Sequence, residues 1–157
     1  MLTLIVGIAS SLLATGMFIG ASELVRRVIL PWYADKVYRG VRIDGDWDIA
    51  FYKDIPKPAE LQMSFHLSQS GEKISGQYSH GTPDTRRDVY NVVGLVRDGY
   101  FLAYATPVSN RHLDGISILL HIRSKGDDLL MAGSVLCCAS PGTVAAVEPV
   151  TFKLVGR

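Results

Sequence analysis

The 157-residue sequence lacks the residue patterns of known catalytic and metal-binding sites. It contains no H-E-x-x-H, no G-x-S-x-G, no glycine-rich phosphate loop and no His or Cys residues at metal-ligand spacing. The stretch Ser70-Gly71-Glu72-Lys73 fits S-x-x-K, but it has no companion motif and lies at a predicted hairpin turn. We therefore expect a protein that is not an enzyme, with no metal site and no cofactor.

Cysteine is also scarce, since Cys137 and Cys138 are the two in the chain. Adjacent residues of a strand point to opposite faces, which argues against a disulfide between them. The sequence has no N-x-S/T site for N-glycosylation either. Two free thiols agree with a reducing compartment such as the cytosol.

Charge is missing from residues 1–22, which contain no Asp, Glu, Lys, Arg or His. An apolar segment of this length spans the roughly 30 Å hydrocarbon core of a bilayer as a helix. A secretory signal peptide is the alternative, but it needs a basic start, and no Lys or Arg precedes the apolar residues. We predict an uncleaved transmembrane helix over residues 1–22.

The next segment, residues 23–42, carries five basic and two acidic residues. The positive-inside rule then places this flank in the cytoplasm and the amino terminus outside. Pro31 is expected to limit any helix here, and Trp32 and Tyr33 are typical of the lipid headgroup layer. We predict a basic interfacial connector in contact with the lipid bilayer.

Two glycines of the apolar segment, Gly16 and Gly20, form a G-x-x-x-G. Small residues at this spacing let another helix approach closely, although they are also common in membrane helices generally. We expect them to pack membrane helices together in a homo-oligomer.

From residue 43 onward the apolar pattern has a period of two, most clearly in residues 61–68. Short connections between consecutive strands favour an antiparallel meander, and closure removes its exposed edges. We predict an all-β domain over residues 43–157, a small eight-stranded antiparallel up-and-down, calycin-like β-barrel, with a two-layer sandwich as the alternative. The expected strands are 45–53, 60–69, 72–80, 87–97, 99–106, 113–123, 128–138 and 147–155.

The inner positions of these strands are apolar and are expected to fill the barrel, among them Trp47, Phe51 and Phe65. Four glycines in or beside the strands are expected to permit the bends that close a barrel. They are Gly76, Gly94, Gly115 and Gly133.

Alternate connections of an up-and-down barrel emerge at the same end. Three of them are tight glycine-containing turns, whereas the four longer ones, at 54–59, 81–86, 107–112 and 139–146, share the other end. Loops on a rigid scaffold commonly carry binding sites, so we expect the site at this rim, which faces the cytosol.

Aromatic and basic side chains gather near that rim. Aromatic rings stack on bases and arginines bind phosphate, which is what a small nucleotide needs. The alternative is that the tyrosines fill the barrel mouth and that Arg86 and Arg87 are solvated loop charges beside Asp84 and Asp88. His80 and His112 are expected in loops. The candidate ligand-binding residues are Tyr78, His80, Arg86, Arg87, Tyr90, Tyr104, Arg111 and His112.

Two resemblances extend this interpretation. Gly45-Asp46-Trp47 at the start of the first strand resembles the G-x-W of lipocalins and related calycin barrels. The whole layout, an amino-terminal membrane segment before a cytosolic barrel, resembles the two-transmembrane β-strand-rich effectors of bacterial anti-phage defence, in the CBASS and Panoptes systems. This sequence has one spanning segment where that family has two.

The second resemblance implies a membrane effector in the bacterial inner membrane. Its barrel would sense a cyclic di- or trinucleotide and control self-association of the membrane segments and membrane disruption. The net charge of +1 argues against binding to a DNA or RNA polymer. The alternatives are a membrane-tethered calycin-like carrier of an apolar small ligand, and an adaptor that presents the barrel surface to a partner protein.

Overall fold

The computed structural model describes residues 2–52, 55–56, 61–83, 87–109, 114–140 and 143–156. The chain divides into two compact units, Met1–Tyr38 and Arg39–Arg157. The first is helical, and the second is made of antiparallel strands.

The helical unit begins with α1, Leu2–Leu24, and continues through a π-helical turn, η1, Val25–Ile29, into α2, Leu30–Val37. The helical segment that could span a membrane covers Val6–Val37, and its most apolar 18-residue stretch has a mean hydropathy of 1.5 and no buried residues. One helix of the described chain is therefore long and apolar enough to cross a membrane.

Pro31 does not end this helix, contrary to the sequence expectation. It lies in the first turn of α2, directly after the π-helical turn, where a missing backbone N–H is tolerated. Two local contacts flank it: the Arg27 Nε donates to the Glu23 carboxylate at 2.7 Å, and the Lys36 Nζ lies 5.0 Å from the centre of the Trp32 ring. The connector is helical up to Val37.

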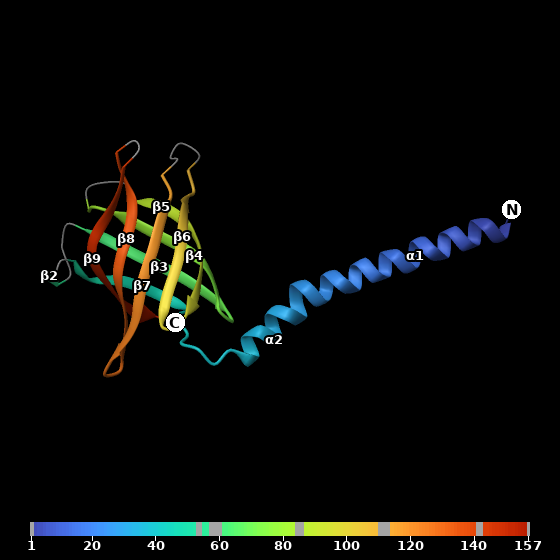
Figure 1. Ribbon diagram of the computed structural model, residues 1–157, viewed down its shortest axis with the longest axis horizontal. Coiled ribbons are helices and arrows are strands. Elements are labelled where there is room, and N and C mark those ends of the chain that lie inside the picture. Colours follow the sequence, from blue (N-terminus) through green and yellow to red (C-terminus); the bar gives the residue numbers. More distant parts are fainter. Residues whose placement is uncertain are drawn as a thin grey trace. The chain divides into compact units, whose positions relative to one another are not determined.

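The second unit is a closed antiparallel barrel of eight long strands, which confirms the predicted fold (Figure 1). Each strand pairs with the next along the chain, and the last strand pairs with the first. A two-residue strand, β2, adds to the end of the first strand. The strands are β1 Gly45–Tyr52, β2 Ile55–Pro56, β3 Gln62–Ser70, β4 Lys73–Gly81, β5 Asp88–Arg97, β6 Tyr100–Pro107, β7 Ile116–Lys125, β8 Asp128–Ser140 and β9 Thr143–Gly156.

The two ends of the barrel differ. At the short-turn end, pairs of residues join β3 to β4, β5 to β6 and β7 to β8, and positive φ angles at Gly71, Gly99 and Gly126 make these reversals. The opposite end holds the longer connections and is called the long-loop end. The long connection expected at 139–146 is largely strand instead, because β8 continues to Ser140 and β9 begins at Thr143.

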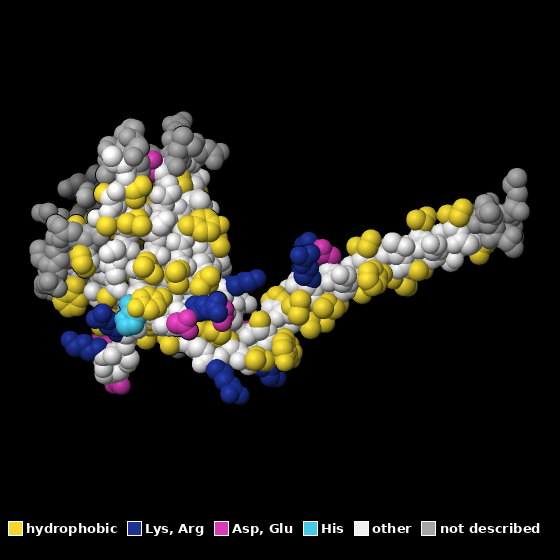
Figure 2. Space-filling model, viewed as in Figure 1, with side chains coloured by type: hydrophobic (Ala, Val, Ile, Leu, Met, Phe, Trp, Pro, Cys, Tyr) yellow, Lys and Arg dark blue, Asp and Glu magenta, His cyan; other side chains and the backbone are white. Residues whose placement is uncertain are grey.

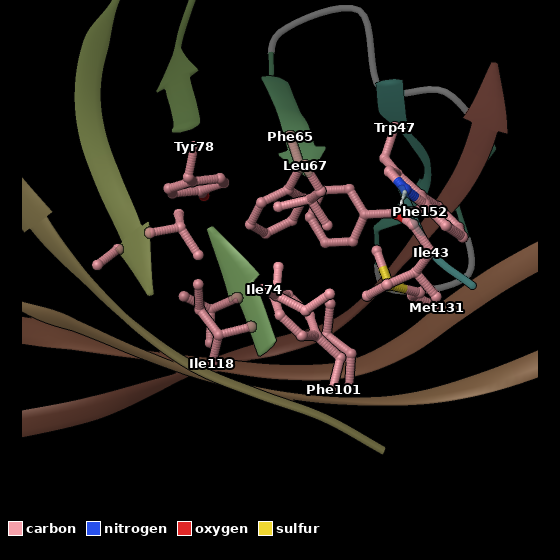
Figure 3. Close-up of a cluster of buried hydrophobic side chains, with 14 of the residues drawn as sticks. Ile43, Trp47, Phe65, Leu67, Ile74, Tyr78, Phe101, Ile118, Met131 and Phe152 are labelled. Atoms are coloured by element: carbon pink, nitrogen blue, oxygen red, sulfur yellow. Dashed lines mark hydrogen bonds between the residues drawn. The ribbon is translucent and has the colours of Figure 1, made fainter. Parts of the chain in front are cut away.

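The barrel interior is filled by side chains. Trp47, Phe65, Phe101 and Phe152 are at most 2% exposed and lie together at its centre (Figure 3). Rings of Phe65 and Phe152 meet edge to face with their centroids 4.7 Å apart. The described interior is thus a packed core.

One core prediction is wrong: Phe51 is 44% exposed. A register shift between Ile49 and Phe51 against β9 inserts an extra residue and reverses the alternation of β1. Tyr52, the next residue, packs against the core instead.

Three of the four predicted glycines lie where the neighbouring strand leaves no room for a side chain. A Cβ atom would lie 2.0 Å from the His66 carbonyl oxygen at Gly76, 2.4 Å from that of Leu102 at Gly94 and 2.2 Å from that of Leu119 at Gly133. At Gly115, in contrast, the nearest described atom to a Cβ would be 3.8 Å away. The close approach of a neighbouring strand therefore does not require a glycine at this position.

Candidate functional site

Three predicted site residues meet on the inner wall of the barrel at the long-loop end. Tyr78 and His80 are alternate residues of β4, and the β4–β5 register places Tyr90 directly opposite Tyr78. Ring centroids are 5.7 Å apart for Tyr78 and His80, 5.4 Å for His80 and Tyr90, and 6.1 Å for the two tyrosines. We call these three residues the aromatic mouth.

The aromatic mouth is continuous with the core. Tyr78 lies 4.7 Å from Phe65, centroid to centroid, and both rings are almost completely buried. Figure 3 shows the Tyr78 ring beside Phe65 and Leu67 at the edge of the buried cluster. Because Phe65 in turn contacts Phe101 and Phe152, the core holds the mouth rigidly from below.

His80 carries the chemically distinctive atom of the site. Within the part of the chain that the structure describes, its Nδ1 is the buried side-chain polar atom that makes no hydrogen bond. An unsatisfied buried polar group typically costs about 1–3 kcal/mol. The wall of the mouth therefore contains a buried polar atom whose hydrogen-bonding capacity is unused.

The aromatic mouth is electrically neutral at physiological pH. Burial lowers the pKa of His80 from its ordinary 6.5, an effect that the nearby Asp88 opposes. Burial also raises the pKa of the Tyr78 and Tyr90 phenols. The neighbouring Tyr90 adds a smaller increase to the pKa of Tyr78, and Asp88 adds one to the pKa of Tyr90. A neutral aromatic wall favours an uncharged or weakly charged planar group.

The other predicted site residues do not join this cluster. Tyr104 is 56% exposed on the outer face of β6, opposite in direction to the buried Phe101 and Ala105. Arg87 donates from its guanidinium to the Gln62 side-chain oxygen, 3.1 Å from the Arg87 Nε, and lines a shallow outer depression of about 370 Å³. The predicted residues Arg86, Arg111 and His112 lie outside the described residues.

Sequence reasoning missed two features of the mouth. His80 lies in β4, not in a loop, and the alternation of β4 with Tyr78 as an inner residue is the signal that could have shown this. Cys137 is a free thiol packed against the core, close enough to contribute to the raised pKa of both tyrosines. A thiol near the mouth offers a chemical reporter for ligand binding.

The described residues include no group of three or more His, Cys, Asp or Glu side chains that could hold a metal ion. In the helical unit, Gly16 and Gly20 are exposed, and a Cβ at either would meet nothing within 4 Å. Their proposed role in helix packing remains a prediction.

No protein-family model and no curated protein sequence matches this chain at a significant level. Solved structures do match. The crystal structure of a rhizavidin–biotin complex has a TM-score of 0.53 at 14% identity, over 72% of this chain and all of that one. The short afifavidin–biotin complex has a TM-score of 0.53 at 16% identity, over 80% of this chain and 98% of that one. Intact apo afifavidin has a TM-score of 0.54 at 16% identity, over 81% of this chain and 91% of that one. The second unit of this chain is therefore a barrel with the avidin-like fold.

Proposed function

We propose that this chain is a membrane-tethered binding protein, not an enzyme, whose barrel takes up a small planar ligand at the aromatic mouth. The apolar helix would anchor it in the bacterial inner membrane with the barrel in the cytoplasm. Of the functions considered for this sequence, the tethered carrier of an apolar small ligand has the strongest support.

The unpaired Nδ1 of His80 is the observation that carries the proposal. A residue that only filled the core would be better replaced by an apolar one, because the buried nitrogen lacks a partner. A ligand that stacks beside Tyr90 and pairs with this nitrogen would remove that cost. The ligand would then be oriented by one hydrogen bond and held by ring contacts.

The comparisons also support a small molecule as the ligand. Two of the similar structures are complexes with biotin, a small molecule. The low identities leave the ligand of this chain open, and the described mouth offers neutral aromatic rings instead of charged groups. We therefore propose a mostly uncharged, conjugated ligand with one polar edge.

Native mass spectrometry of the full chain, purified in mild detergent, tests this proposal. We expect a small co-purified molecule on the wild-type protein, lost in His80→Phe and Tyr90→Ala. His66→Phe is the matched control, because His66 lies exposed on the outer face of β3. Absence of any bound molecule, together with no thermal shift with biotin or with any member of a panel of small aromatic compounds, would overturn it.

The cyclic-oligonucleotide effector is a second candidate, because stacked aromatic rings accept nucleobases as readily as other planar groups. It needs phosphate-binding cations, for which Arg86 and Arg111 are the candidates. Calorimetry with cyclic di- and trinucleotides would show binding that weakens in Arg86→Ala and Arg111→Ala. Binding that is absent, or unchanged in both variants, would reject this candidate and leave the carrier.

A further inference from the structure

The outer surface of the barrel has two unlike sides. On β3 and β4 the outward residues are polar, as in the cross-strand pairs His66–Gln77 and Ser68–Ser75. On β5 to β8 they are mostly large and apolar. Seven of these are 41–56% exposed. One is Tyr100, at the short-turn end of β6, and the other six lie in two adjacent rows: Val93, Leu95, Leu102, Tyr104, Leu119 and Leu136. We call these six residues the outer apolar face.

The strand register makes this face continuous. Leu95 pairs with Leu102, and Leu102 pairs with Leu119, which gives one row of leucines across three strands. The adjacent row runs from Val93 through Tyr104 and Ser117 to Leu136. Directly opposite residues on neighbouring strands touch, so the two rows form one patch.

Charged residues border the patch without entering it. Arg97 and Arg123 are the outward residues of β5 and β7 nearer the short-turn end, and Arg123 donates to the His121 ring at 3.1 Å. Figure 2 shows hydrophobic side chains over the near side of the barrel and charged ones gathered toward its lower end. An apolar centre with a polar border is typical of a protein interface.

The area fits a second copy of the same barrel. Six side chains of this size, each about half exposed, present roughly 500 Å², at the upper end of what a monomer ordinarily leaves uncovered. A stable interface buries about 800 Å² of each partner, of which roughly 60% is apolar. The patch therefore supplies about the apolar area that one side of such an interface needs.

The absence of charge within the two rows also suits self-association. In a two-fold interface the same residues of both copies face one another, so a charged face would repel itself. The opposite side of the barrel would bring Asp46 and Asp48 of the two copies together, whereas the outer apolar face brings leucine to leucine. We propose that two copies of this chain associate through the outer apolar faces of their barrels, side by side.

Cysteine cross-linking of the full chain in lipid nanodiscs or detergent tests this proposal. In a background with Cys137 and Cys138 changed to Ser, Ser117→Cys places a thiol inside the patch. Ser68→Cys is the matched control, an exposed serine on the polar side of β3 that is not paired with any residue of the patch. With a short bis-maleimide we expect a covalent dimer at Ser117 and none at Ser68.

Adding Leu102→Glu to the Ser117→Cys chain should reduce the cross-linked fraction about tenfold or more, since like charges would meet in the interface. Leu102→Gln with Leu119→Gln is a second, uncharged disruption, and a cooperative thermal transition confirms that each variant is folded. The dimer should persist in Gly16→Leu with Gly20→Leu, which alters the helix alone.

Three results would overturn the proposal: equal cross-linking at both positions, a Ser117 dimer that survives the Leu102 and Leu119 changes, or one that depends on the helix glycines alone. A further alternative is that lipid covers the patch, and an environment-sensitive dye attached to Ser117→Cys detects it. If the dye is shielded in vesicles that carry one copy each, lipid and not a second barrel covers the patch.

Discussion

The side-chain oxygen of Gln69 accepts a hydrogen bond from the backbone N–H of Ile43 at 2.7 Å, across 26 positions of sequence. The amide nitrogen of Gln69 donates to the carbonyl oxygens of Gly71, at 2.8 Å, and Val41, at 3.3 Å. Trp47 adds a bond from its ring nitrogen to the Ile43 carbonyl oxygen at 2.9 Å. One buried glutamine thus fastens the segment that enters the barrel to the turn between β3 and β4.

Replacing Gln69 should therefore weaken the barrel. Gln69→Leu leaves the buried Ile43 N–H without its partner, and we expect the free energy of unfolding to fall by about 2–3 kcal/mol. Chemical denaturation of the full chain in detergent measures this change. Gln77→Leu, at an exposed position of β4, is the control and should change the value by about 0.5 kcal/mol or less. Equal effects of the two substitutions would contradict the role of Gln69.

Gly133 should not tolerate a side chain. In Gly133→Ala the new Cβ would lie 2.2 Å from the Leu119 carbonyl oxygen and 2.9 Å from the Leu120 Cα, so β7 and β8 would have to separate. We expect a loss of roughly 1–3 kcal/mol in the free energy of unfolding. Gly115→Ala provides the comparison, since the nearest described atom to its new Cβ would be 3.8 Å away, and it should leave the melting temperature nearly unchanged.

The stability of the barrel should depend on pH through His80. Its pKa is lowered in the folded state, so below pH 6.5 the unfolded chain binds a proton that the folded chain does not. The free energy of unfolding then rises with pH through this window, and the contribution is complete above 6.5. Melting temperatures between pH 5.5 and 7.5 should show this slope in the wild type and a flatter one in His80→Phe.

Tyr90→Phe is the control for that measurement, because it retains His80 and the stacked ring. Its slope should match that of the wild type. A slope that is the same in His80→Phe and Tyr90→Phe would assign the pH dependence to other groups.

The apolar helix should remain on the mature protein, with the barrel in the cytoplasm. Intact mass analysis of the chain isolated from bacterial membranes should include residues 1–22, whereas a cleaved signal sequence would remove them. A green fluorescent protein fused after Arg157 should fluoresce, and alkaline phosphatase at the same position should be inactive. The reverse pair of results would place the barrel outside the cytoplasm.

Most strands could be predicted because the alternation of residues such as those of β3 has a polar outer side. Where both faces of a strand are apolar, the sequence pattern does not show which face points into the barrel. In β6, Phe101 and Ala105 face inward while Leu102 and Tyr104 face outward, and hydrophobicity alone does not distinguish the two sets. For this reason the sequence did not reveal that Tyr104, a predicted ligand-binding residue, lies on the outer face of β6.

Other features depend on contacts that lie far apart in the sequence. The reversal at Phe51 arises from pairing with β9, about a hundred residues later, and the passage of the helix through Pro31 depends on the π-helical turn before it. The unpaired nitrogen of His80 follows from the packing of Tyr78 and Tyr90 around it. Local sequence patterns contain none of this information.

The pairing of β9 with β1 has a consequence for copies of this chain that are crowded together. Because each of the eight long strands is hydrogen-bonded on both sides, a neighbouring copy finds no strand to extend. Crowded copies can then meet through side chains alone, and such contacts separate again without any backbone hydrogen bond being broken. Closure of the barrel therefore favours reversible assembly over the growth of aggregated sheets.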